Sequence, residues 1–215
     1  FIIRSSGRPE DYFIGQAMVY SEREVPSYLA SDYRIGRTPR EITADIYKNV
    51  ASADELTKKQ YLDMKLWLPG DILLKADKMS MAHSLELRVP FLDRRVMELA
   101  ERIPAGYRIK DGITKYVLRQ AANRTIPDDW ANRPKVGFPV PIRYWFRDER
   151  YYKYARDYFT SPEARRFFDS DALVRLLDEH KAGADRSRKI WIVYMFLMWY
   201  KIYFVDKTVP KKPAA

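Results

Sequence analysis

The chain has 215 residues, a formal net charge of +10 and no cysteine. The missing cysteine excludes disulfides, thiolate metal sites and a thiol nucleophile in this sequence, and it is typical of a cytoplasmic protein, where we expect this one. A hydrophobic fraction of 47% suffices for one sizeable core, so composition predicts one globular domain. The positive charge would suit nucleic acid, an anionic membrane or a phosphate-bearing substrate.

The predicted elements are nearly all helical, because no segment alternates cleanly between apolar and polar residues over a useful length. Residues 1–20 look irregular, and we expect them to dock against another part of a longer protein. Ser21 with Glu24 forms a capping box that predicts a short helix, and a second box at Thr38 predicts a longer one. Another helix is expected over 54–68.

Residues 68–95 combine an apolar pattern with many polar side chains. Leu74, Met81 and Leu85 recur at helical spacing and predict a stripe that faces the core. The polar members are Asp77, Ser80, Ser84, Glu86, Arg88 and Asp93. Since a buried ionised group costs several kcal/mol unless it is paired or bound, we expect this segment to hold something polar.

The spacing of Asp77, Ser80 and Ser84 places them on one face of the predicted helix. We expect that helix to end near Glu86, because Pro90 disfavours helical geometry in the residue before it. Asp77 and Ser80 are interpreted as scaffold rather than as catalytic residues.

Glu86 and Arg88 stand two residues apart on a segment expected to be extended, so they should point to opposite sides and pair poorly with each other. One interpretation is a buried ion-pair network with Arg119, Asp93 or Asp77. The other is that Glu86 contacts a substrate. Asp93 is also expected to cap the next helix.

Lys115 is the residue that we expect to take a direct part in a reaction. After the turn at residues 111–112, Thr114 is the predicted N-cap, which puts Lys115 in a first helical turn, where the macrodipole disfavours a cation by about 0.3 to 1 kcal/mol. Arg119 follows on the same face and adds like-charge repulsion. A phosphate would relieve both penalties. The alternative is that Lys115 reaches into solvent and Arg119 pairs with an acid.

The C-terminal third is predicted to form further helices. Ser161 opens one, and Asp171 is expected to cap another that ends at Gly183. Residues 190–200 are apolar on every side, but a membrane span needs about 20 such residues, so we expect a central core helix. Residues 207–215 are expected to be a tail.

Neither histidine has a second ligand at metal-binding spacing, so we expect no metal site made by this chain alone. The tyrosines and phenylalanines over 144–168 could stack nucleic-acid bases, but this pattern is more typical of packing in a helical domain.

Three motifs together resemble one family. Residues 79–93, MSMAHSLELRVPFLD, resemble the C-terminal half of the synthetase domain of glutamine-hydrolysing asparagine synthetases. Residues 114–119, TKYVLR, are similar to the lysine-bearing K-x-x-L-R helix of that family, and residues 133–138, RPKVGF, are similar to its KxGF loop. The similarity covers most of 61–145.

The resemblance implies a mostly α fold, namely the helical portion of an adenine nucleotide alpha hydrolase-like (ATP pyrophosphatase) α/β synthetase domain whose parallel sheet is not in this sequence. We expect residues 21–206 to form this helical subdomain. The family's SGGxDS loop and acidic GxDE motif are absent from the sequence, which starts at Phe1, so we expect the tail of a larger enzyme. Its partners would be an N-terminal glutaminase domain and the nucleotide-binding half of the synthetase domain.

In the longer enzyme, the family adenylates the side-chain carboxylate of aspartate with ATP and then amidates it with ammonia from glutamine. ATP and Mg²⁺ would be the cofactors, and we expect this chain alone to bind neither and to be inactive. The resemblance implies that Lys115 stabilises charge on the ATP phosphates or on the acyl-adenylate. The other expected roles are catalytic for Glu86, substrate- or phosphate-binding for Arg119, Lys135 and Arg88, and structural support for Asp77, Ser80, Ser84 and Asp93.

Two alternatives remain open. A related adenylating amidotransferase or cyclase that acts on another carboxylate, similar to β-lactam synthetase, would carry the same motifs. A basic helical module that binds nucleic acid would explain the charge, but acids and bases are interspersed along most of the chain, which makes this reading weaker.

Overall fold

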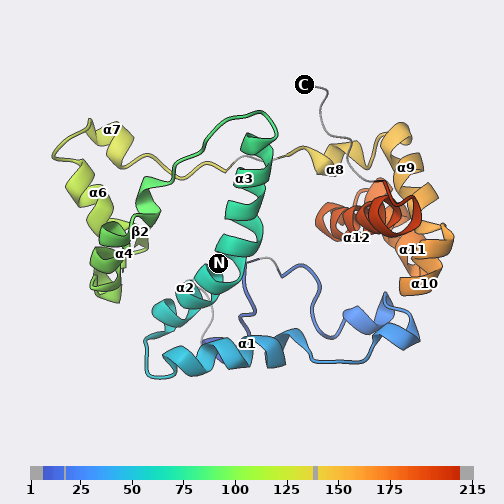
Figure 1. Ribbon diagram of the computed structural model, residues 1–215, viewed down its shortest axis with the longest axis horizontal. Helices are drawn as coiled ribbons and strands as arrows, with labels where there is room; N and C mark the ends of the chain where they lie inside the picture. The colour runs from blue at the N-terminus through green and yellow to red at the C-terminus, as the bar shows by residue number, and fades with distance from the viewer. Residues whose placement is uncertain (1–6, 17, 138–139, 209–215) are drawn as a thin grey trace. The chain divides into compact units, whose positions relative to one another are not determined.

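The computed structural model describes residues 7–16, 18–137 and 140–208. It is mostly helical, as predicted (Figure 1). The chain divides into two compact units: unit 1 comprises Phe1–Ala17 and Pro39–Gly137, and unit 2 comprises Met18–Thr38 and Phe138–Ala215. Each unit has its own hydrophobic cluster, whereas composition led us to expect one core.

Unit 1 consists of helices and one short hairpin. Its α-helices are α1 (Pro39–Tyr47), α2 (Glu55–Lys65), α3 (Leu74–Met81), α4 (Arg94–Glu101), α5 (Ala105–Arg108), α6 (Tyr116–Ala122) and α7 (Asp128–Ala131). Three 3₁₀ turns (Pro9–Asp11, Lys48–Val50 and Pro90–Leu92) and a π-helical turn (Leu68–Leu73) complete its helical part. The strands β1 (Ile109–Lys110) and β2 (Ile113–Thr114) pair antiparallel, with Ile109 opposite Thr114.

Helix α2 begins where the sequence predicted, because the Asp54 side chain accepts a hydrogen bond of 2.9 Å from the backbone N–H of Thr57. The π-helical turn then leads directly into α3 (Figure 1). Pro69 lies in this turn and has no N–H to donate, so the regular helical ladder cannot continue through it. The two helices predicted separately are therefore linked by a local change of helix type.

The core of unit 1 is formed by Phe13, Tyr47 and Leu62, all buried. The Tyr47 hydroxyl donates a hydrogen bond of 2.8 Å to the backbone carbonyl of Phe13, so its polar end is satisfied inside the cluster. The prediction that the N-terminal segment docks elsewhere is thus wrong for Phe13, which packs within this chain. Residues 1–6 lie outside the described residues.

Unit 2 is built from α8 (Ile142–Trp145), α9 (Glu149–Phe159), α10 (Pro162–Phe167), α11 (Ser170–Lys181) and α12 (Ser187–Tyr200). Two 3₁₀ turns (Val25–Ser27 and Ser31–Tyr33) and a π-helical turn (Lys201–Val205) belong to it as well. The Glu24 carboxylate accepts from the backbone N–H of Ser21, but the Ser21 hydroxyl donates to that carboxylate and does not accept from the Glu24 N–H. Only half of the predicted capping box therefore forms, and it precedes a 3₁₀ turn instead of the expected short helix.

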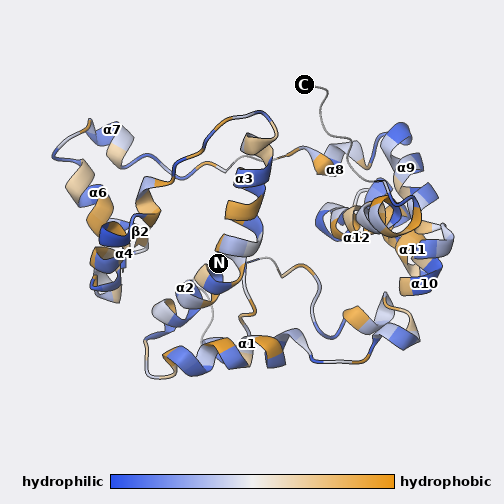
Figure 2. Ribbon diagram, in the orientation of Figure 1, coloured by the Kyte–Doolittle hydropathy of each residue, from blue (hydrophilic) through white to orange (hydrophobic). Residues whose placement is uncertain are grey.

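Helix α12 contributes Ile190, Val193 and Leu197 to the core of unit 2. Helix α12 carries both hydrophobic and hydrophilic residues (Figure 2), and Met195 and Trp199 on its other side are exposed. The expectation of a helix buried all round is therefore wrong, since only one stripe is covered within this chain. Among the described residues, no helix is long and apolar enough to cross a membrane.

The ends of the unit 2 helices follow local signals. Ser161 caps α10, as predicted, but α11 is capped by Asp169, whose side chain accepts from the N–H of Ala172 at 2.8 Å, and not by Asp171. Gly183 follows α11 with φ +122°, which is the left-handed conformation expected there. Helix α11 therefore ends where predicted, but it starts two residues earlier than predicted.

His180 is fully buried in unit 2 and has a structural role. Its Nε2 lies 2.9 Å from the backbone carbonyl of Arg143, and its Nδ1 lies 3.0 Å from the backbone N–H of Arg186. The same Nδ1 also lies 3.0 Å from the backbone carbonyl of Ala184, so the ring contacts α8 through one nitrogen and the loop after α11 through the other. The ring thereby fastens the loop after α11 to α8.

The Glu24 carboxylate predicts how unit 2 responds to acid. It pairs with Lys189 and accepts from Ser21, and these bonds lower the pKa of Glu24 to about 2, with Lys189 the larger cause. Because the folded-state pKa is depressed, the stabilisation is present above the unfolded pKa of about 4.3 and is lost as pH falls towards 2. The carboxylate is 42% exposed, so solvent screening limits its contribution to the order of 1 kcal/mol.

Glu24→Gln should therefore lower the free energy of unfolding at pH 7 and change it little at pH 2. Urea denaturation of the wild type and the variant at both values measures this difference. An equal destabilisation at the two values would contradict a contribution from the charge, because the glutamine oxygen can still accept from Ser21.

Candidate functional site

The predicted site residues lie in unit 1, in two places. The first is α3, which carries Asp77 and Ser80, together with the α3 exit, which we define as residues 82–93 between α3 and α4. The second place consists of the β1–β2 hairpin, α6 and the loop after α7. We call this loop, residues 132–137, the 132–137 loop. No hydrogen bond or ion pair joins the two places among the described residues.

Helix α3 ends earlier than predicted, at Met81 and not near Glu86. The N–H of Leu85 donates to the carbonyl of Ser80, and the N–H of Ser84 donates to that of Met81, both at 3.0 Å. This pair of bonds defines a Schellman motif, and Ser84 adopts the left-handed conformation it requires, with φ +55°. Ser84 therefore does not share a helix face with Asp77 and Ser80, contrary to the prediction.

The apolar stripe of α3 is not covered by the described residues of unit 1. Leu74, Met81 and Leu85 are 46%, 56% and 62% exposed, and α3 has no buried residue. Asp77 is exposed as well, and the Ser80 hydroxyl donates to the Asp77 carbonyl at 3.1 Å. The expectation of buried charge here is wrong for the chain as it stands, because its polar groups meet solvent.

Glu86 and Arg88 pair with each other, contrary to the prediction, with 2.5 Å between Oε1 and Nη2. Both side chains are long and highly exposed, 71% and 83%, so they are free to bend around the backbone and meet. An exposed pair of this kind contributes about 0 to 1 kcal/mol. The buried network with Arg119, Asp93 or Asp77 is not formed in the described part of the chain.

Asp93 caps α4, as predicted, by accepting from the backbone N–H of Arg95 at 2.9 Å. The Arg95 guanidinium also donates to this carboxylate, and that hydrogen bond is the larger cause of the lowered pKa of Asp93. A groove of about 550 Å³ runs beside the cap and is lined by Pro90, Asp93, Arg95, Val96 and Leu99. Lys115 does not line it.

Lys115 follows the hairpin in an unusual conformation. Asp111 and Gly112 have φ +51° and +77°, the signature of a type I′ turn, which fits the tight hairpin. Thr114 belongs to β2 and is not the N-cap; Lys115 itself occupies that position, with φ +57°. For a residue with a side chain this left-handed backbone costs about 1 to 2 kcal/mol.

The corrected position changes the argument for Lys115. It precedes α6 instead of lying in its first turn, and α6 has only seven residues, so the predicted dipole penalty does not apply in that form. Its side chain is exposed. The distinguishing features of Lys115 are therefore a strained left-handed backbone and an exposed side-chain amine.

Arg119 binds backbone carbonyls, and its predicted alternative of pairing with an acid is wrong. Its Nε donates to the carbonyl of Thr114 at 3.0 Å, and its Nη1 donates to those of Ala131 at 2.9 Å and Arg133 at 3.1 Å. Lys135 lies on the 132–137 loop, exposed, as predicted. No pattern in the sequence pointed to carbonyls as partners of Arg119.

Sequence reasoning also missed a cavity of about 920 Å³ between α2 and the α4–α5 region. Arg108 lines it and donates to Gln60 at 2.6 Å and to Thr57 at 2.7 Å. None of the predicted site residues lines this cavity. Within the described ranges, no group of three or more His, Cys, Asp or Glu residues could hold a metal ion.

Comparison with known proteins gives consistent matches. The family model described as asparagine synthase matches residues 6–201. The chain is 40% identical over 204 residues to asparagine synthetase [glutamine-hydrolyzing] 1 of Bacillus subtilis, which covers 94% of the chain and 32% of that relative. A putative asparagine synthetase [glutamine-hydrolyzing] of Mycobacterium bovis is 40% identical over 97% of the chain and 32% of its own length.

An asparagine synthetase [glutamine-hydrolyzing] of Gallus gallus is 46% identical over 81 residues, which cover 34% of the chain and 14% of the relative. No solved structure matches the chain. The chain thus spans about a third of the length of the first two relatives, at 32% of each.

Proposed function

Because the chain belongs to the asparagine synthase family, we propose that it forms the helical C-terminal part of the synthetase domain of a glutamine-dependent asparagine synthetase. The observation that carries this proposal is the identity of 40% over 94% of the chain with a relative of that name. The longer enzyme would activate the side-chain carboxylate of aspartate with ATP, release pyrophosphate, and form the amide with ammonia from glutamine.

The exposed apolar surface of unit 1 supports a partner that covers it. The large apolar side chains over 74–99 that remain exposed are Leu74, Met79, Met81, Leu85, Leu87, Val89, Phe91, Val96 and Leu99. Exposed apolar side chains that are scattered singly need no explanation, but nine within this one segment support an interface. We propose that the nucleotide-binding half of the synthetase domain, with the parallel sheet of an adenine nucleotide alpha hydrolase-like fold, packs here.

The residue roles are proposed by position in the motifs. Lys115 would neutralise charge on the phosphates of ATP or on the acyl-adenylate, since its amine is exposed and its backbone is strained, as at many functional sites. Glu86 would contact the substrate, with Arg88 beside it, and Lys135 would reach the phosphates from its loop. ATP supplies the adenylyl group; Mg²⁺ would be held by its phosphates and by acids outside this chain.

The test uses the full-length protein that carries this sequence. Pyrophosphate release is measured with ATP and Mg²⁺ in the presence of aspartate, glutamine or related carboxylates. We expect release that depends on aspartate, followed by asparagine formation when glutamine is added. Release with another carboxylate and not with aspartate would favour a β-lactam synthetase-like enzyme, and no release with any carboxylate would refute the proposed activity.

A further inference from the structure

The guanidinium of Arg119 connects two segments that carry the lysines of the proposed site. Its Nε reaches the carbonyl of Thr114, the residue directly before Lys115, at 3.0 Å. Its Nη1 reaches the carbonyl of Arg133, two residues before Lys135, at 3.1 Å, and that of Ala131 at 2.9 Å. One side chain therefore ties the end of the hairpin to the start of the 132–137 loop.

These bonds use most of the donors of Arg119. A guanidinium has five N–H groups, and the single Nε–H and both Nη1–H groups point at carbonyls here, which leaves Nη2. The bond to Ala131 is partly buried, so water competes poorly for it, whereas the bonds to Thr114 and Arg133 are exposed. A side chain engaged in this way is poorly placed to bind a phosphate, the role that the sequence suggested for it.

We propose that Arg119 is a positioning residue that acts through Lys115. It holds the carbonyl of Thr114, and with it the left-handed backbone of Lys115, against the 132–137 loop, so that both lysine amines are presented in a fixed relation. This inference rests on the proposed function. Its physical basis is the planar fork of arginine, which binds several oxygens at once, whereas a lysine in the same place is a point charge.

Arg119→Lys and Arg119→Gln in the full-length protein test the role. Displacing a catalytic group by about 1 Å can cost about 10²-fold in rate, so both variants should lower kcat for pyrophosphate release by that order, with the KM for ATP little changed. Arg124→Gln is the matched control, since Arg124 follows α6 and no described side-chain contact involves it; we expect wild-type rates. The proposal would be overturned if Arg119→Lys kept its activity and Arg119→Gln raised the KM for ATP. That result would indicate that Arg119 binds a phosphate directly.

A double-mutant cycle with Lys115→Ala separates positioning from a general structural role. If Arg119 acts through Lys115, Arg119→Gln should cost about 10²-fold in the wild-type background and almost nothing once Lys115 is alanine. If the rate of the double variant is instead lowered by the product of the two single-variant losses, the proposal is contradicted. Circular dichroism of each variant checks that the fold is retained.

A second readout does not depend on the proposed activity. Trypsin can cut after Lys135 but cuts poorly after Arg133, which precedes a proline, so cleavage at 135–136 reports on the 132–137 loop. We expect faster cleavage in Arg119→Gln than in the wild type or in Arg124→Gln. Equal rates would refute the connection itself. If the wild type releases no pyrophosphate, the proposed function fails, and the cleavage rates alone decide whether Arg119 fixes the loop.

Discussion

Replacing Lys115 by alanine should lower the rate of aspartate-dependent pyrophosphate release by the full-length protein by about 10²- to 10³-fold, the size expected for losing one group that stabilises developing charge. The amine is exposed next to a hairpin with a type I′ turn, and its backbone is held with φ +57°. The loss should appear in kcat, because charge on the leaving group develops in the transition state. Steady-state kinetics with a coupled pyrophosphate assay measures it.

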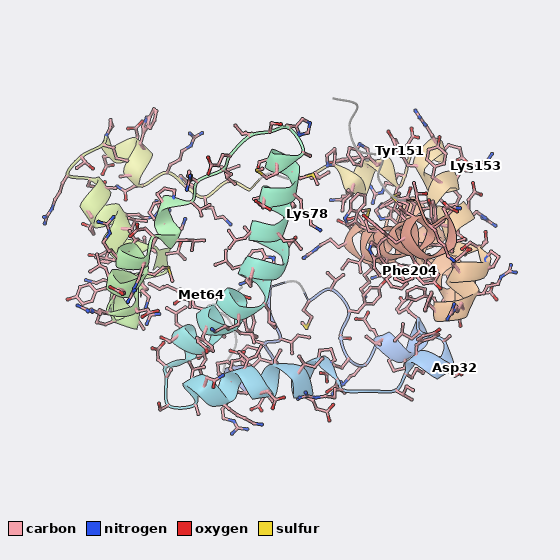
Figure 3. The ribbon with its side chains drawn as sticks, in the orientation of Figure 1. Asp32, Met64, Lys78, Tyr151, Lys153 and Phe204 are labelled. Atoms are coloured by element: carbon pink, nitrogen blue, oxygen red, sulfur yellow. The ribbon has the colours of Figure 1, made fainter. Side chains whose placement is uncertain are left out.

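Two variants make the result specific. Lys115→Gly removes the amine while it relieves the left-handed strain, so its fold should be at least as stable as the wild type and its loss of rate equal to that of the alanine variant. Lys153→Ala removes an exposed lysine from α9 in unit 2 (Figure 3), outside the proposed interface, and should leave the rate unchanged. Glutamine hydrolysis should persist in all three. A wild-type rate in Lys115→Gly would exclude the amine from the reaction.

Local signals in the sequence predicted local structure. Asp93 and Ser161 start the helices that they were expected to start, because a side-chain oxygen beside the first free N–H groups is sufficient for that interaction. Asp54 caps the helix that was expected to begin there, although it was not predicted as the cap. The turn at residues 111–112 was equally readable, since Asp-Gly tolerates two positive φ angles. Each of these interactions spans only a few residues and needs no knowledge of the remaining chain.

Burial was not predictable in the same way. The periodicity of Leu74, Met81 and Leu85 correctly indicated a helix with an apolar face up to Met81, but a pattern does not say what covers that face. In the described part of unit 1 nothing does, so the charges beside it are exposed, and Glu86 is free to pair with Arg88. The early end of α3 was missed because a left-handed serine is an uncommon Schellman residue.

The candidate site was readable only through its motifs. Sequence reasoning placed Lys115 one position too far into a helix, because Thr114 is an ordinary capping residue and nothing marked it as the end of a strand. Two of the three partners of Arg119 lie 12 and 14 residues downstream, and all three are carbonyl groups, which have no sequence signature. Residue roles that depend on such contacts can be recognised only in the three-dimensional structure.

Phe159→Ala should lower the free energy of unfolding of unit 2 by about 3 to 5 kcal/mol, the usual cost of emptying a phenylalanine site in a core. Phe159 is 0% exposed on α9 and packs in the cluster with Leu173, Leu177 and Leu197. Tryptophan fluorescence during urea denaturation follows the change, because Trp191 packs against the same cluster.

The matched control for the core is another aromatic residue of unit 2. Tyr144 on α8 is 68% exposed, so Tyr144→Ala should change the free energy of unfolding by no more than about 0.5 kcal/mol. A similar loss in both variants would mean that the aromatic residues over 144–168 stabilise unit 2 mainly through its surface. A large loss confined to Phe159→Ala would assign the stability to the buried stripe where α9, α11 and α12 meet, which is the packing that the described contacts imply.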